Sequence, residues 1–203
     1  MRSCYYIEWE HQHGYKLRRT SGFGTSSTLP VWKTVWGLNV PAKIKIHCWR
    51  SLLGAIPCNG VLANRHMQPS SQCELCRTDC ESIRHAFFTC PRVREIWALL
   101  GMGETVSHIC SIEREGNSIL ETLFRDGLAK APLMPEVDRN DIVATAVWYM
   151  WWERRQATHG EVVQVPARTA QAISALALNF SRAKKNKSGI KRHGWIKPRE
   201  DFL

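Results

Sequence analysis

The sequence lacks any apolar run long enough to cross a bilayer and any hydrophobic core of a secretory signal. The longest apolar stretch, from Ile142 to Trp152, is interrupted by Thr145 and falls well short of the roughly 20 residues that a membrane span needs. The segment from Met1 to Tyr6 does not have the apolar character of a signal peptide. We therefore expect an intracellular protein of the nucleus or cytoplasm, neither secreted nor membrane-bound, whose cysteines stay reduced.

Acidic residues are few relative to basic ones. The 203-residue chain contains 28 Lys and Arg against 18 Asp and Glu, which gives a formal net charge of +10. Such an excess favours a polyanionic partner, of which nucleic acid is the commonest, and a soluble protein with a basic tail is the alternative interpretation. Hydrophobic residues make up 44% of the chain, enough for a core, so neither a disordered nor a fibrous protein is expected.

Apolar residues recur every three or four positions through most of the chain, and this period predicts a mainly α-helical fold. A helix is expected from about Pro41 to Gly54, and another opens at Pro91, because proline fits the first turn of a helix. Apolar stripes at helical spacing continue over three further segments, 119–128, 141–156 and 166–180.

The N-terminal segment departs from this helical pattern. Residues 5–18 alternate partly between apolar and polar side chains around Gly14, which predicts a β-hairpin. Residues 21–30 are rich in Gly, Ser and Thr, which predicts a loop. Residues 1–29 are therefore expected to form a lead-in to the helical part of the chain.

Four candidate metal ligands are concentrated in residues 73–90, in the pattern Cys-x2-Cys-x8-His-x4-Cys. Structural zinc takes four tetrahedral ligands from thiolate and imidazole groups. We therefore expect a structural Zn²⁺ ion bound by four residues, Cys73, Cys76, His85 and Cys90, with the last two at either end of a short helix or turn. Cys80 and His66 lie close enough in sequence to replace a ligand. Buried, reduced cysteines acting as small hydrophobic residues are the alternative to a metal site.

Basic residues gather at two places outside the expected zinc site. Three of them lie off the apolar stripe of the helix at 41–54: Lys43, Lys45 and Arg50. A second group belongs to an acid-free run near the C-terminus: Lys184, Lys185 and Lys187. Both groups are candidate contacts for nucleic-acid phosphates, and a solvated helix face and a flexible linker are the structural alternatives.

Three groups of residues carry a resemblance to a known family. They are the run from Trp32 to Lys45 with Trp49-Arg50, the pair Ile56-Pro57 with Leu62, and the cysteine–histidine segment with Glu81, Ala86-Phe87-Phe88, Pro91 and Trp97. Over roughly residues 5–100, the chain resembles the reverse-transcriptase zinc-binding domain of plant non-LTR (LINE-type) retroelements. The resemblance implies a module C-terminal to a reverse transcriptase and often followed by a ribonuclease H-like domain. It also implies that this chain is a fragment or degenerate copy of such a polyprotein.

Catalytic motifs of those neighbouring domains are missing from the sequence. No Tyr-x-Asp-Asp-type motif occurs, and no set of carboxylates is spaced for two-metal phosphodiester hydrolysis. Cys80 stands where the resemblance leads us to expect a polar residue. We therefore expect no enzymatic activity and no small-molecule substrate, with a truncated nuclease as the disfavoured alternative.

These observations predict one organisation for the chain. After the lead-in at 1–29, a zinc-binding helical module is expected at 30–101, a helical connector at 112–183 and a basic, disordered tail at 184–203. The predicted function is that of a non-catalytic structural-zinc module that binds RNA or single-stranded DNA. A protein-interaction module with an unknown partner and a remnant without function are the alternatives.

Overall fold

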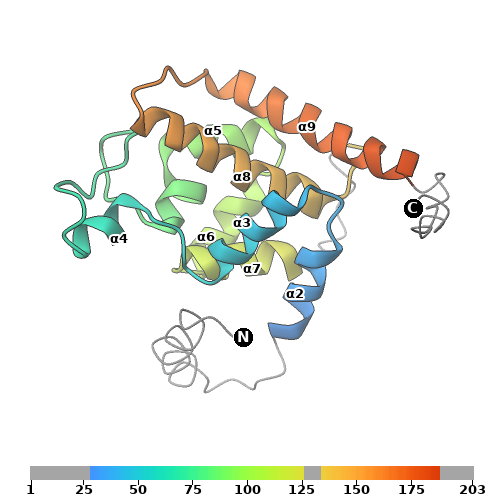
Figure 1. Ribbon diagram of the computed structural model, residues 1–203, viewed down its shortest axis with the longest axis horizontal. Helices are drawn as coiled ribbons and strands as arrows, with labels where there is room; N and C mark the ends of the chain where they lie inside the picture. Colours follow the sequence, from blue (N-terminus) through green and yellow to red (C-terminus); the bar gives the residue numbers. More distant parts are fainter. Residues whose placement is uncertain (1–27, 126–133, 188–203) are drawn as a thin grey trace, which may run out of the picture.

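The computed structural model describes residues 28–125 and 134–187, which are mainly α-helical (Figure 1). The elements in chain order are α2 (Thr28–Gly37), α3 (Ala42–Leu52), α4 (Asn59–Asn64), the π-helical turn η1 (His85–Thr89), α5 (Pro91–Leu99), α6 (Gly103–Ile112), α7 (Gly116–Arg125), α8 (Arg139–Thr158) and α9 (Pro166–Lys187). Within these ranges, β structure is limited to two isolated bridges, Gln72–Cys80 and Met134–Val137. The predicted mainly α fold is confirmed, while the predicted hairpin lies outside the described residues.

Helix α3 forms where the sequence predicts a helix. Pro41 precedes it as the N-cap, with φ −56° and ψ 149°. Gly54 follows it with φ +70°, a left-handed value that glycine adopts without steric cost. Ile44 and Cys48, one helical turn apart, are fully buried. The predicted apolar stripe therefore faces the core.

Helix α5 begins at Pro91, as predicted. Its buried residues Val93, Ile96 and Trp97 lie on one face, at the spacing that the apolar pattern indicates. The indole Nε1–H of Trp97 also donates a hydrogen bond to the carbonyl oxygen of Phe87 at 2.7 Å. This bond fixes α5 against η1, the turn that carries one of the predicted metal ligands.

Helix α8 is the central element of the fold. Figure 1 shows α9 lying along one side of α8, with α3 and α7 on the other, and these helices are in contact. Most residues of α8 are buried, including polar ones such as Thr145, Glu153 and Arg154, as expected for a helix enclosed on several sides. No helix in the described ranges combines the length and the apolar character needed to span a bilayer.

One hydrophobic core joins the segment predicted as the zinc module to the segment predicted as a connector. Ile44 of α3 and Phe87 of η1 belong to the same buried cluster as Val147 of α8 and Ile173 of α9. All four side chains are fully buried. The helices C-terminal to residue 112 therefore complete the core around the predicted metal site.

The sequence-based boundaries differ from the structure at two places. Helix α2 begins at Thr28, within the segment 21–30 that the composition predicts to be a loop. Its buried residues Val31 and Val35 lie one turn apart, and α2 packs on α7, which is distant in sequence. Helix α9 continues through Lys187, so residues 184–187 are helical and do not belong to the expected disordered tail. Residues 188–203 lie outside the described part of the chain.

Gly116, at the start of α7, provides a test of how closely α7 packs on the backbone of residues 83–84. A Cβ added at Gly116 would lie 2.3 Å from the backbone nitrogen of Arg84 and 2.7 Å from the carbonyl carbon of Ile83. Gly116→Ala should therefore lower the free energy of unfolding by about 1–3 kcal/mol, measured by urea denaturation. Gly37→Ala is the matched control, since no atom lies within 4 Å of its added Cβ, and it should leave stability unchanged or raise it by up to about 1 kcal/mol. Equal effects of the two substitutions would contradict the packing.

Candidate metal centre

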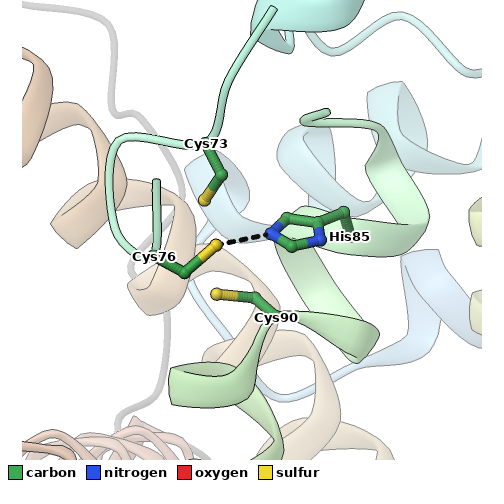
Figure 2. Close-up of side chains that lie close together, drawn as sticks. All are labelled: Cys73, Cys76, His85 and Cys90. Carbon is green, nitrogen blue, oxygen red and sulfur yellow. Dashed lines mark hydrogen bonds between the residues drawn. The ribbon is translucent and has the colours of Figure 1, made fainter. Parts of the chain in front are cut away.

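A tight turn after α4 places the first two cysteines side by side. The amide of Arg77 donates a hydrogen bond to the carbonyl oxygen of Cys73 at 2.8 Å, and the amide of Cys73 donates to the carbonyl of Asp79 at 2.9 Å. Arg77 itself takes φ +56°, a left-handed value that reverses the chain just after Cys76. The thiols of Cys73 and Cys76 consequently point toward the same centre (Figure 2).

The π-helical turn η1 supplies the other two side chains. The amide of Cys90 donates to the carbonyl oxygen of His85 at 3.0 Å, the i→i+5 bond of a π turn. His85 and Cys90 therefore stand at the two ends of one wide turn, as the sequence predicts. Between them, Phe87 and Phe88 are buried in the core, which anchors the turn.

The four predicted ligands converge. The ligand atoms of Cys73, Cys76, His85 and Cys90 all lie within 4.8 Å of one another, and Cys76 Sγ is 3.3 Å from His85 Nε2 (Figure 2). A tetrahedral zinc ion with bonds of about 2.0–2.3 Å requires ligand atoms roughly 3.5–3.8 Å apart. The cluster therefore fits a zinc ion, with three thiolates and one imidazole as its ligands.

The two alternative ligands do not join this cluster. Cys80 is exposed and forms the antiparallel bridge with Gln72. His66 is also exposed, and it has φ +55° in the turn after α4. Asp79 lies outside the cluster, with its Oδ2 atom 3.8 Å from His85 Nδ1, and its side chain is largely exposed.

The pKa values of the cluster show how strongly its members interact. A hydrogen bond with Cys73 raises the pKa of His85 to about 9, against the opposing effect of burial. Although burial acts in the opposite direction, hydrogen bonds from the hydroxyl and amide of Thr78 and from the amide of Asp79 lower the pKa of Cys76. A hydrogen bond with Cys73 lowers the pKa of Cys90. A divalent cation competes with these protons, so zinc binding must weaken as the pH falls.

Glu81, just after the cysteine turn, connects the metal centre to α8. Its carboxylate is fully buried and accepts hydrogen bonds from Arg154 Nε at 2.8 Å and Arg154 Nη2 at 2.6 Å. Its Oε2 also accepts the amide hydrogen of Asn59 at 2.7 Å, and Arg154 Nη2 donates to Asn59 Oδ1. The guanidinium further lies over the Trp151 ring, 4.9 Å from its centroid. Only the family resemblance pointed to Glu81 in the sequence. The buried ion pair with Arg154 gives this residue a structural role.

A second buried ion pair joins α5, α8 and α9. Arg92 Nη2 donates to Glu153 Oε2 at 2.9 Å, and the hydroxyl of Thr169 donates to Glu153 Oε1 at 2.6 Å. Glu153 and Thr169 are buried. Because Cys90 caps the N-terminus of the helix that carries Arg92, this pair also fixes a ligand-bearing segment against α8. No local sequence pattern marks either ion pair, since the partners lie far apart in the chain.

The predicted basic residues occupy different environments. Lys43 and Arg50 are exposed on α3, and both line the groove between α3 and α8. Lys45 is half-buried and donates from Nζ to the carbonyl oxygen of Trp36 at 2.8 Å. Lys184 is exposed at the end of α9 and donates to Asn39 Oδ1. Residues 185 and 187 belong to α9, but the side chains of Lys185 and Lys187 lie outside the described part of the structure.

Comparisons with known proteins agree with the geometry of this site. Residues 9–97 match the family described as zinc-binding in reverse transcriptase. A protein of Arabidopsis thaliana named "Putative ribonuclease H protein" is 24% identical over 127 residues, which make up 63% of this chain and 20% of that protein. The chain therefore spans about a fifth of the length of the curated relative that it matches. No solved structure matches the chain.

Zinc content distinguishes the four cluster residues from Cys80. Protein purified under reducing conditions should contain one zinc ion per chain, measured by inductively coupled plasma mass spectrometry. Cys73→Ser should remove most of this zinc and much of the stability, because zinc binding supplies on the order of 10 kcal/mol in structural sites. Cys80→Ser is the matched control and should retain the full amount. Loss of zinc from the control, or its retention in Cys73→Ser, would contradict the assignment of ligands.

The buried ion pair of Glu81 and Arg154 should contribute strongly to folding. Glu81→Gln leaves the Arg154 guanidinium buried without its counter-charge, so the free energy of unfolding should fall by about 3–5 kcal/mol. The control is the same substitution at Glu121, whose partner Arg125 lies one turn away, with both side chains about one-third exposed. Glu121→Gln should cost less than about 1 kcal/mol. Similar losses in the two variants, measured by chemical denaturation at constant zinc, would refute this role.

Proposed function

We propose that the chain is a non-catalytic, zinc-stabilised module that binds nucleic acid, because residues 9–97 match the family described as zinc-binding in reverse transcriptase. In this proposal, the ion has a structural role, because a site with four protein ligands leaves no coordination position for a reactant. The helices after residue 97 belong to the same unit, since they complete its core. The module takes its place within a retroelement-derived protein of the plant non-LTR type.

The net charge of +10 is the observation that carries the proposal. The buried carboxylates Glu81 and Glu153 are each paired with one arginine, Arg154 and Arg92, so these pairs leave the excess of basic residues unchanged. Lys43 and Arg50, by contrast, are exposed and face one groove. An excess of exposed cations attracts the phosphate backbone without regard to base sequence.

A role limited to protein interaction receives less support from the fold. Such a role would need a large apolar face, which exposed apolar residues of the segment 141–156 would have to supply. In the structure this segment forms α8, which is largely buried against α3, α7 and α9. Trp152, 40% exposed, is the single large apolar side chain of α8 that remains substantially exposed. The exposed Ile46 of α3 lines the same groove as Trp152, but three exposed cations also line it, so this surface is not the broad apolar face of a protein-binding patch.

The name of the relative in Arabidopsis thaliana supports a retroelement context for this chain. That protein of Arabidopsis thaliana is named for ribonuclease H, and the matching region is a small part of its length. We propose that the present module supplies nucleic-acid affinity beside catalytic domains of that kind and performs no phosphodiester chemistry itself. The template or product strand of reverse transcription is then the natural ligand.

A salt titration tests this function directly. Zinc-loaded protein should bind fluorescein-labelled single-stranded RNA and DNA, with the affinity falling about tenfold or more between 50 and 200 mM salt, because phosphate contacts release counterions. Fluorescence anisotropy measures the binding. A morpholino oligomer of the same base sequence has an uncharged backbone and should bind far more weakly. Absence of binding, or an affinity that does not change with salt, would exclude the proposed function.

A further inference from the structure

A groove of about 640 Å³ lies between α3 and α8. Its volume falls within the range of about 300–1,000 Å³ that is typical of sites for small ligands. The two helices supply the residues that matter here: Lys43, His47, Arg50, Trp148, Trp152 and Arg155. The groove lies apart from the metal centre, since none of the four zinc ligands lines it.

Aromatic rings form the inner surface of this groove. The His47 imidazole is stacked on Trp151, with ring centroids 6.1 Å apart and an angle of 28° between the planes. Trp152 contacts Tyr149, with ring centroids 5.2 Å apart, and 40% of its surface is exposed. An exposed indole offers a flat apolar face to a ligand.

The charges around the groove are of one sign. Lys43, Arg50 and Arg155 are exposed, and no Asp or Glu is among the residues that line the groove. The other guanidinium there, that of Arg154, is paired with Glu81. His47 contributes no charge at neutral pH, since burial lowers its pKa to about 4. Its Nε2 atom has no hydrogen-bond partner within the described ranges.

We propose that this groove binds an unpaired nucleotide of a single-stranded nucleic acid, with the base stacked on Trp152 and the phosphates held by Lys43, Arg50 and Arg155. The inference rests on the proposed function and assigns it to one site. An aromatic platform bordered by cations is the arrangement by which proteins hold single strands without strong sequence preference. In a duplex, base stacking hides the faces that the indole requires, so single strands are the preferred ligands.

Variants at the rim of the groove test the proposal. Trp152→Ala should weaken binding of zinc-loaded protein to fluorescein-labelled U12 and dT12 by roughly 5-fold to 100-fold, because stacking on an aromatic side chain contributes that much affinity per base. Trp49→Ala is the matched control, since Trp49 is 38% exposed on α3 but does not line the groove. Its affinity should equal that of the wild type, and comparing U12 with dT12 distinguishes RNA from DNA.

A second variant removes the cations and leaves the aromatic platform intact. The triple substitution Lys43→Gln, Arg50→Gln, Arg155→Gln alters exposed residues, so it should fold even if Trp152→Ala does not. It should weaken binding to both strands and reduce the slope of log affinity against log salt by about two to three. Zinc content and thermal unfolding establish that each variant is folded.

The possible outcomes separate this inference from the function on which it rests. If the wild type binds single strands and both groove variants bind as tightly as Trp49→Ala, the groove is not the site, while the proposed function stands. If Trp152→Ala weakens binding to a 12-base-pair duplex as much as to U12, recognition of an unpaired base is refuted. If the wild type binds no nucleic acid, both proposals fail.

Discussion

Three cysteine sulfurs and one imidazole nitrogen lie within 4.8 Å of one another. As ligands of one zinc ion, they hold a segment that has little regular structure of its own. Between the end of α4 and residue 82, the chain has no helix and forms a single isolated β bridge. The ligands at 73 and 76 belong to this segment, whereas those at 85 and 90 belong to a turn anchored by Phe87 and Phe88 in the core. A zinc ion therefore attaches the irregular segment to the packed helices, and the free energy of metal binding becomes free energy of folding.

Fixing this segment has consequences far from the ion, because it also carries Glu81. That carboxylate is placed against Arg154 of α8 and the amide of Asn59 at the start of α4. A buried charge pair is costly to desolvate and tolerates few alternative geometries, so it favours one arrangement of the metal-binding segment against α8. The same guanidinium packs over Trp151, which itself stacks on His47. The metal centre and the α3–α8 groove are thus connected by contacts between neighbouring side chains.

The sequence was informative where the physical signal is local. The Cys-x2-Cys turn, the His85–Cys90 spacing and the apolar stripes of α3 and α5 each lie within a few helical turns, and the structure places them as predicted. Helix α8 is buried on more sides than its apolar stripe indicates. The features that were missed depend on distant partners. Glu81 and Arg154 are 73 positions apart, and α2 is completed by its packing on α7. Likewise, Trp152 comes to line one groove with Lys43 and Arg50 only after α3 and α8 have packed.

X-ray absorption spectroscopy at the zinc edge tests the metal centre most directly, because it measures the ligands of the bound ion without any substitution in the chain. The structure predicts a first coordination sphere of three sulfur atoms at about 2.3 Å and one nitrogen atom at about 2.0 Å. A sphere containing two sulfurs, or one completed by oxygen ligands, would contradict the account of how residues 73–90 are held.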